Sequence, residues 1–246
     1  MHPDHPRLLS DLVQAARAGS PGHDHAAYAG SEHRAYNVPI PALRRIAKLW
    51  LAEDKDRPAS AILQMVDSLF ASDSLDEKIL AGIVLGCAPK ARKAATPDDV
   101  ARWLGELTGW AEVDTLCQNL FTAEDMQADW PAWRRLIEGL SRDGNINKRR
   151  ASLVLLTGPV RYSDDTRFSD IAFAMIGRHQ AARDILITKA VSWLLRSLTT
   201  RHANAVARYL EANAATLPKI AVRETRTKLE TGTKSGRDNE RGRSAT

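Results

Sequence analysis

The sequence predicts an all-α protein, built as a solenoid of about a dozen short helices that pair into hairpins. Apolar residues recur with helical spacing along nearly the whole 246-residue chain, whereas the alternation of β-branched and aromatic residues typical of strands is almost absent. Pro, Gly, Asn and Asp interrupt these apolar segments at short intervals. Similar segments also recur along the chain, which favours a repeat architecture.

Each expected helix is bounded by residues that begin or end helices. The clearest beginning is Thr96-Pro97-Asp98-Asp99, an N-cap, a proline at the first helical position and two acids, so a helix should run through Leu107. Breakers such as Gly19–Gly22 and Asp143–Asn145 should end helices rather than link domains. Further helices are expected near residues 5–18, 40–53, 58–71, 75–87, 112–121, 130–141, 146–157, 166–177, 183–198, 201–212 and 218–229.

The repeat is visible in segments 78–85, 148–155 and 188–195, which share a basic residue near the start, a small residue and an apolar end. With segment 113–117 as a further copy, the small residues fall 33, 37 and 40 residues apart, at Gly82, Thr115, Ser152 and Ser192. This spacing suits HEAT-like helical hairpins, with one helix of each hairpin lining a concave surface. Amphipathic helices also resemble one another without being repeats, and that alternative stays open.

Composition predicts an ordered, soluble protein. Hydrophobic residues make up 43% and charged residues 26% of the chain, and no apolar run approaches the roughly 20 residues of a membrane span. Residues Met1–Ser10 lack the charged and then apolar layout of a secretory signal, so we expect a cytoplasmic protein.

The net charge of +5 is concentrated at the C-terminal end. Residues 219–246 contain eight Lys or Arg and four Asp or Glu, which leaves +1 for the other 218 residues. The last stretch, Thr231–Thr246, has no large apolar residue and is expected to be a disordered basic tail after a single domain of residues 1–230. Bulk charge is therefore weak support for a nucleic-acid partner, and local clusters must carry that argument.

Cysteines and histidines point to no metal centre. Cys87 and Cys117 lie in apolar stretches, which predicts inert buried thiols. The N-terminal histidines lack Cys or carboxylate partners at ligand spacing, so we expect no metal there: His2, His5, His23, His25 and His33. Glycine-rich phosphate loops, a nucleophile elbow and a CxxC pair are also absent from the sequence.

Three short patterns contain residues that suit chemistry. Trp110 and Asp114 are four residues apart, so on a helix the indole and the carboxylate share a face that suits a cationic or electron-poor ligand. The alternative is a capping acid beside a core tryptophan. Lys148-Arg149-Arg150 should lie in the first turns of a helix, where bare amides and cations together attract a phosphate. The alternative is a solvated charged face.

The third pattern is Lys189–Arg196, in which Trp193 stands where the other copies of the repeat have leucine or isoleucine. The largest side chain at this repeat position suggests a surface role.

Four stretches together resemble the AlkD-like, HEAT-like-repeat family of DNA alkylation repair glycosylases. They are Tyr28–Arg44, Trp110–Asp114, Arg149–Leu153 and Lys189–Arg196, and they occur in family order over about residues 8–229. The resemblance implies a right-handed superhelix with a concave DNA-binding face. It also implies that Trp110 and Trp193 contact the deoxyribose and backbone at the lesion, that Asp114 acts at the glycosidic bond and that Arg150 holds a phosphate. Tyr28, Lys148, Arg149 and Arg196 would join the DNA-facing surface.

The sequence departs from the family at two positions. Family members often carry an acid directly after the first tryptophan, where this chain has Ala111, and an aromatic residue shortly before the arginine, where it has Asn147. These changes bear on lesion range and local DNA geometry.

The implied activity is that of a monomeric, monofunctional glycosylase on cationic N3- or N7-alkylpurines in duplex DNA, with no metal or organic cofactor and with water as nucleophile. The chemistry is sound, because a cationic base leaves readily, and a carboxylate and tryptophan faces can stabilise an oxocarbenium-like sugar. Two alternatives remain: a non-catalytic helical-repeat protein that binds unusual DNA structures, and a protein-binding scaffold.

Overall fold

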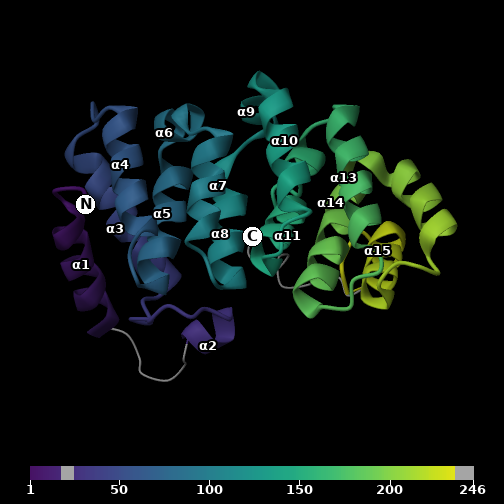
Figure 1. Cartoon of the computed structure of the whole chain (residues 1–246), viewed down its shortest axis with the longest axis horizontal. Coiled ribbons are helices and arrows are strands. Elements are labelled where there is room, and N and C mark those ends of the chain that lie inside the picture. Colours follow the sequence, from purple (N-terminus) through teal and green to yellow (C-terminus); the bar gives the residue numbers. More distant parts are fainter. Residues whose placement is uncertain (18–24, 236–246) are drawn as a thin grey trace, which may run out of the picture. The chain divides into compact units, whose positions relative to one another are not determined.

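Helices provide almost all the regular structure of the part of the chain that the computed structural model describes, residues 1–17 and 25–235 (Figure 1). The strand-type pairing recorded there is an isolated parallel bridge between Arg34 and Ser74. The all-α prediction is confirmed. Most of the predicted disordered tail, residues 236–246, lies outside the described residues, as does His23.

The chain divides into two compact units, Met1–Ala151 and Ser152–Thr246. A single domain over residues 1–230 and one concave surface therefore stay predictions. The first unit contains α1 (His5–Arg17), α2 (His25–Ala29), α3 (Ile40–Glu53), α4 (Ala59–Phe70), α5 (Leu75–Cys87), α6 (Pro89–Ala94), α7 (Pro97–Gly105), α8 (Trp110–Leu120), α9 (Ala123–Ala128), α10 (Trp130–Leu140) and most of α11 (Ile146–Val154).

Helix α5 is the centre of the first unit. Helices α1, α3, α5 and α8 lie side by side in that order, and α4 packs on α5 as well (Figure 1). Leu80, Val84 and Leu85 are fully buried there, as residues of a helix covered on several sides must be. Gly82 of α5 meets Thr115 of α8, because a Cβ on Gly82 would lie 3.0 Å from the Thr115 methyl. Two of the predicted repeat's small residues thus permit the close α5–α8 approach.

The second unit contains α12 (Pro159–Tyr162), α13 (Thr166–His179), α14 (Ile185–Asn213) and α15 (Lys219–Thr231). Helix α14 packs against the other three. It joins the two helices expected at 183–198 and 201–212, and the predicted break survives as a kink at His202, whose φ of −123° and ψ of 34° are not helical. The two helices predicted there are thus confirmed as the two arms of α14, which meet at this kink.

Within the described residues, four short helices lie where the sequence predicts none: α2, α6, α9 and α12. Segments of four to six residues contain too few apolar positions for their period to show. Local signals were nevertheless present. Thr122 and Asp125 form a capping box that begins α9, just as Thr96 and Asp99 begin α7 where the sequence predicted it.

Neither cysteine forms a disulfide, and Cys117 is buried whereas Cys87 is half-buried. Burial raises the pKa of the Cys117 thiol well above its usual range, and the nearby charge of Asp114 acts in the same direction. A thiol of this kind is unreactive at neutral pH, as the sequence predicts for Cys117. Among the described residues, no helix is both long enough and apolar enough to cross a membrane.

Candidate functional site

Asp114 and Arg150 form a paired ion contact between α8 and α11. Arg150 Nε donates to Asp114 Oδ1 at 2.8 Å, and Nη2 donates to Oδ2 at 2.7 Å. The Arg150 side chain is 6% exposed and that of Asp114 is 16% exposed. Two parallel bonds fix the plane of a carboxylate as a single bond cannot. The buried guanidinium therefore orients a carboxylate that keeps some contact with solvent.

This geometry adds to the role that the sequence suggested for Arg150. The resemblance implies a phosphate contact, whereas the structure directs two of its donors at Asp114. The partners lie 36 residues apart in the chain, so neither helical periodicity nor local spacing indicated the pairing. A phosphate contact by Arg150 stays a prediction.

Trp110 begins α8 and is paired with Tyr28. Its indole Nε1 donates to the Tyr28 backbone carbonyl at 3.0 Å, and the two rings meet edge to face with centroids 5.4 Å apart. Tyr28 is 77% exposed, while Trp110 is half-buried. Trp110 and Asp114 are one turn apart on the same helix, so they lie on the same side of α8. The structure thus brings Tyr28, Trp110, Asp114 and Arg150 together within the first unit.

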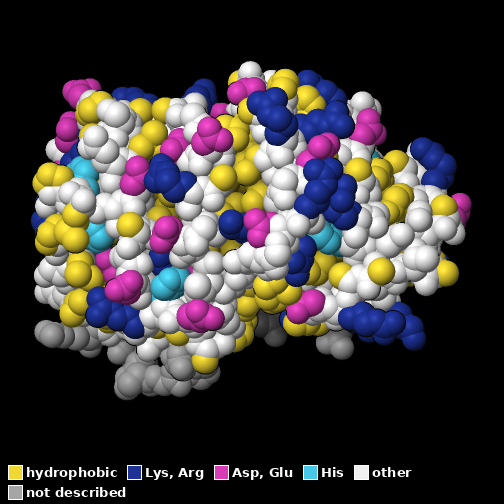
Figure 2. Space-filling view, in the orientation of Figure 1, with side chains coloured by type: hydrophobic (Ala, Val, Ile, Leu, Met, Phe, Trp, Pro, Cys, Tyr) yellow, Lys and Arg dark blue, Asp and Glu magenta, His cyan; other side chains and the backbone are white. Residues whose placement is uncertain are grey.

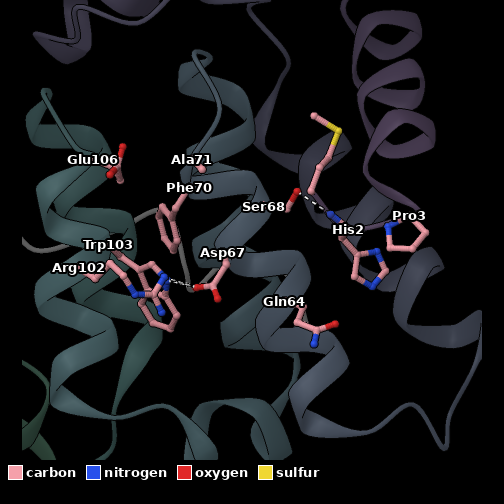
Figure 3. Close-up of a pocket in the computed structure, with 11 residues that line it drawn as sticks. His2, Pro3, Gln64, Asp67, Ser68, Phe70, Ala71, Arg102, Trp103 and Glu106 are labelled. Atoms are coloured by element: carbon pink, nitrogen blue, oxygen red, sulfur yellow. Dashed lines mark hydrogen bonds and ion pairs between the residues drawn. The ribbon is translucent and has the colours of Figure 1, made fainter.

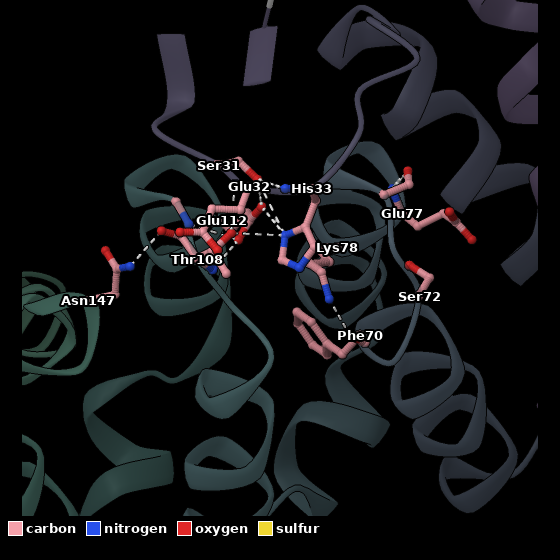
Figure 4. A network of polar contacts seen from close by, with 12 residues as sticks. Ser31, Glu32, His33, Phe70, Ser72, Glu77, Lys78, Thr108, Glu112 and Asn147 are labelled. Atoms are coloured by element: carbon pink, nitrogen blue, oxygen red, sulfur yellow. Dashed lines mark hydrogen bonds and ion pairs between the residues drawn. The ribbon is translucent and has the colours of Figure 1, made fainter. Parts of the chain in front are cut away.

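The beginning of α8 is held by the α2–α3 connection, residues 30–39 (Figure 4). Glu112 is buried, and its Oε2 accepts from the backbone N–H groups of Thr108 at 2.8 Å and Gly109 at 3.1 Å. Its Oε1 accepts from the Ser31 hydroxyl and lies 2.9 Å from His33 Nδ1. One carboxylate therefore caps α8 and ties it to a segment about 80 residues earlier.

Gly109 permits this contact sterically. A Cβ at Gly109 would lie 2.7 Å from the Ala29 carbonyl oxygen and 3.0 Å from Ser31. The α2–α3 connection is itself fastened to α5, because Asp76 accepts from the backbone N–H groups of Tyr36 at 2.6 Å and Val38 at 2.9 Å. Helices α5 and α8 and the α2–α3 connection together therefore fix the position of Trp110.

Asn147, where the family often has an aromatic residue, links α11 to the same place. Its Nδ2 donates to the Thr108 carbonyl at 2.6 Å (Figure 4). The helix that carries Arg150 is therefore tied directly to the turn that precedes Trp110. The departure from the family pattern has a structural role here.

Lys148 and Arg149 close the loop before α11. Lys148 Nζ lies 3.4 Å from Asp143 Oδ2, and Arg149 Nη1 donates to the carbonyls of Asp143 at 2.7 Å and Gly144 at 2.8 Å. Both side chains are half-buried. These contacts give Lys148 and Arg149 a structural role within the loop. DNA binding by the two residues stays a prediction.

Trp193 and Arg196 lie in the second unit, three residues apart on α14. Trp193 is half-buried while its neighbours Leu194 and Leu195 are fully buried, so the indole is partly accessible. Arg196 Nε lies 3.3 Å from both Ser192 Oγ and Glu224 Oε2. Trp193 belongs to the second unit, whereas Trp110 and Asp114 belong to the first, so a site shared by the three residues stays a prediction.

Two of the N-terminal histidines, His5 and His33, hold parts of the first unit together. His5 Nε2 lies 2.7 Å from Glu77 Oε1, and its Nδ1 lies 2.7 Å from Ser68 Oγ. His33 belongs to the Glu112 network described above. Within the described residues, no group of three or more His, Cys, Asp or Glu side chains is placed to hold a metal ion.

A hollow of about 550 Å³ lies apart from these residues (Figure 3). Its lining includes Asp67, Arg102 and Trp103, with Asp67 Oδ1 accepting from both of the other two at 2.7 Å. None of the candidate site residues lines it. On the face of α3 to α8 seen in Figure 2, acidic and basic side chains are mixed, which agrees with the small net charge outside the C-terminal region.

The comparisons with known proteins agree with this fold. Residues 12–229 match the family described as DNA alkylation repair enzyme. A solved structure described as a predicted DNA alkylation repair enzyme from Enterococcus faecalis is similar with a TM-score of 0.65 and 16% identity, over 82% of this chain and 91% of that one. No curated protein matches the sequence. At 16% identity the structural likeness supports the helical fold, whereas the family match covers most of the chain. The chain therefore belongs to the DNA alkylation repair enzyme family.

Proposed function

We propose that this protein is a monofunctional DNA glycosylase that releases cationic alkylated purines, of the N3-methyladenine and N7-methylguanine type, from duplex DNA. The observation that carries the proposal is the partly exposed Asp114 carboxylate, oriented by Arg150 and on the same side of α8 as Trp110. Family membership supports a role in the repair of alkylated DNA. We place the protein in the cytoplasm, on the nucleoid when bound to DNA, and working as a monomer.

The proposed reaction makes modest demands on the protein. A purine alkylated at N3 or N7 carries a positive charge, so the bonding electrons of the breaking C1′–N bond neutralise the base as it leaves. The sugar develops oxocarbenium character, which an oriented carboxylate stabilises electrostatically. The faces of Trp110 and Trp193 would attract the same developing charge. No metal or organic cofactor is required for these steps.

Water completes the proposed reaction. The Asp114 carboxylate accepts a hydrogen bond from a water molecule as the water oxygen bonds to C1′, and the proton passes through Asp114 to solvent. The products are a neutral free base and an intact abasic site. The bidentate contact with Arg150 keeps the carboxylate plane fixed during this sequence.

DNA contacts would come from both units. Tyr28, Lys148 and Arg149 lie in the first unit, and Arg196 lies in the second. Lys148 and Arg149 already brace a loop, so a phosphate there would meet positioned cations.

The test is to incubate the protein with duplex DNA treated with a methylating agent and to separate the released bases by chromatography. We expect N3-methyladenine and N7-methylguanine to be released faster than the spontaneous rate in buffer. DNA binding without any release above that rate would overturn the proposal and favour a non-catalytic DNA-binding protein. Absence of salt-dependent DNA binding would favour a protein-binding scaffold instead.

A further inference from the structure

A serine, a histidine and a glutamate from three helices of the first unit form one chain of hydrogen bonds. His5 begins α1, and its Nδ1 lies 2.7 Å from Ser68 Oγ of α4 while its Nε2 lies 2.7 Å from Glu77 Oε1 of α5. The partners lie 63 and 72 residues from His5, so no short sequence motif contains them. The side chains of His5 and Glu77 are 6% and 3% exposed. The contact between these two groups is therefore shielded from solvent.

The hydrogens of this chain all point in one direction. A carboxylate only accepts, so His5 Nε2 carries the imidazole hydrogen and donates it to Glu77. In the neutral ring Nδ1 is then an acceptor, and the Ser68 hydroxyl donates to it. The His2 backbone N–H donates to Ser68 Oγ at 2.9 Å, which leaves the hydroxyl hydrogen for His5 (Figure 3). The imidazole is thus placed as a base beside a hydroxyl, with a carboxylate at its other nitrogen.

The hydroxyl of Ser68 is used differently from those of other helical residues of this chain. A serine or threonine inside a helix commonly donates to a carbonyl of the preceding turn. Ser169 of α13 donates to the Thr166 carbonyl at 2.9 Å, and Thr199 of α14 donates to the carbonyl three residues before it at 2.8 Å. Ser68 donates to an imidazole nitrogen instead. Its hydroxyl is therefore placed for proton transfer to a base.

Ser68 also borders a space that a small molecule can occupy. It is half-buried, and it lines the hollow of about 550 Å³ described above. Met1, Pro3 and Ala71 supply apolar surface to the same hollow. Gln64 lies one turn before Ser68 on α4 and lines the hollow as well (Figure 3). A side-chain amide donor and the hydroxyl therefore lie on the same side of one helix, next to a partly apolar space.

We propose that Ser68 is the nucleophile of a second site, with His5 as its base and Glu77 as a positioning residue. The site would hydrolyse small carboxylic esters that carry a short apolar acyl group, since the hollow offers room and apolar surface beside the hydroxyl. This activity goes beyond the proposed glycosylase and does not depend on it, because none of the candidate DNA-site residues lines the hollow.

The reaction uses an acyl-enzyme intermediate. Ser68 Oγ bonds to the ester carbonyl carbon as its proton passes to His5 Nδ1, and the Gln64 amide donates to the carbonyl oxygen as that oxygen becomes negative. The bond to the alcohol oxygen then breaks, and the alcohol leaves with the proton held by His5. A water molecule attacks the acyl group by the same steps, which releases the carboxylic acid and restores the hydroxyl. The charge of Glu77 stabilises the imidazolium that forms in between.

The first experiment labels the nucleophile covalently. The full chain is used with nothing added before Met1, because that residue lines the hollow. It is treated with diisopropyl fluorophosphate, which forms an O–P bond with an activated serine as fluoride leaves, and mass spectrometry of the intact protein and its peptides locates the adduct. We expect a single adduct on Ser68 and none in Ser68→Ala. The matched control is Ser60→Ala, which changes an exposed serine of the same helix and should be labelled like the wild type.

The second experiment measures the hydrolysis of p-nitrophenyl acetate. His5→Gln keeps hydrogen-bonding groups but cannot take the proton, so kcat should fall at least roughly 100-fold. Glu77→Gln still offers an acceptor to His5 Nε2 but lacks the charge, so kcat should fall at least roughly tenfold while KM stays within about twofold. A general loss of structure would not leave KM unchanged, and circular dichroism melting checks that each variant is folded.

Labelling of the wild-type protein decides the outcome even if the variant of the buried His5 does not fold. No adduct on the wild-type chain, or an adduct on a residue other than Ser68, would overturn the site. Equal rates of ester hydrolysis by Ser68→Ala and Ser60→Ala would overturn it as well, because the ester would then react elsewhere on the protein.

Discussion

Asp114 is the residue on which the proposed chemistry depends, and its surroundings make a specific prediction. Asp114→Asn keeps the shape and an acceptor for Arg150 but removes the charge that would oppose an oxocarbenium ion. The loss of one oriented electrostatic contact typically costs about 2.7–4 kcal/mol, so single-turnover base release should fall roughly 100- to 1000-fold. Affinity for undamaged duplex should stay within about twofold, since the change lies at the reacting atoms.

The control for this change is Asp170→Asn, which removes an exposed carboxylate from α13 and should leave base release unaffected. Excision by Asp114→Asn at near the wild-type rate would remove Asp114 from the mechanism.

Replacing Arg150 by lysine tests whether Arg150 acts by orienting the Asp114 carboxylate or by its positive charge. Arg150→Lys keeps one positive charge but cannot donate two parallel bonds to Asp114, so the carboxylate loses its fixed plane. We expect base release to fall while the salt dependence of DNA binding stays unchanged. A fall in DNA affinity with a normal single-turnover rate would instead assign Arg150 to a phosphate. Rapid-quench base release and fluorescence anisotropy provide the two measurements.

At the scale of the helices, the beginning of α8 links the fold to the site. Glu112 holds two backbone N–H groups of the α8 cap together with Ser31 and His33 of the α2–α3 connection. Glu112→Ala should lower the free energy of unfolding by about 1.5–3 kcal/mol, the range for hydrogen bonds to a charged group. It should also slow base release, because Trp110 lies in the first turn of the same helix.

Urea unfolding checks the stability change, and Glu138→Ala on α10 removes a partly exposed acid as the matched control. A loss of stability in Glu112→Ala no larger than that in the control would show that the network does not hold α8.

A second prediction at this scale concerns the buried Lys78 of α5, whose Nζ donates to the Phe70 carbonyl at 2.6 Å. Burial lowers the pKa of Lys78 below its usual 10.5 in the folded protein, against the opposing pull of Glu112. Between the folded and unfolded pKa values the unfolded chain binds the extra proton, so stability due to this group rises with pH. Lys78→Met should abolish that rise, whereas Lys90→Met, at an exposed position, should retain it.

Urea unfolding between neutral pH and about pH 10.5 measures the difference between the two variants. Parallel curves for the wild type and Lys78→Met would contradict a lowered pKa.

The helices show that the sequence predicts local features, such as helix beginnings, better than contacts between distant residues. The capping box and the proline of α7 both act within four residues, so the sequence predicts where this helix begins, although it ends at Gly105 and not at Leu107. The same local chemistry at Thr122 begins α9, which the apolar pattern does not predict because six residues are too few to show a helical period. The contacts of Asp114 with Arg150 and of Ser31 with Glu112 join residues 36 and 81 positions apart, and no local period encodes such pairings.

For the whole molecule, the question is whether water or a lysine amine is the nucleophile that attacks C1′ of the deoxyribose. A glycosylase that also cleaves the strand needs an amine of lowered pKa at the sugar, to form a Schiff base. Lys148 pairs with Asp143, and Lys189 is exposed on α14. Burial lowers the pKa of Lys228, but its Nζ donates to the Arg196 backbone carbonyl. These positions favour water as the nucleophile and an uncleaved strand as the product.

The central claim is a hydrolytic release of a cationic base, and one mass balance tests it most directly. A duplex with a single N7-methylguanine is incubated with the wild-type protein, with and without borohydride, and free base, abasic sites and strand breaks are counted. We predict equal amounts of free N7-methylguanine and intact abasic site, with strand breaks only after alkali. Base release no faster than in buffer, or a covalent protein–DNA adduct trapped by borohydride, would contradict the account.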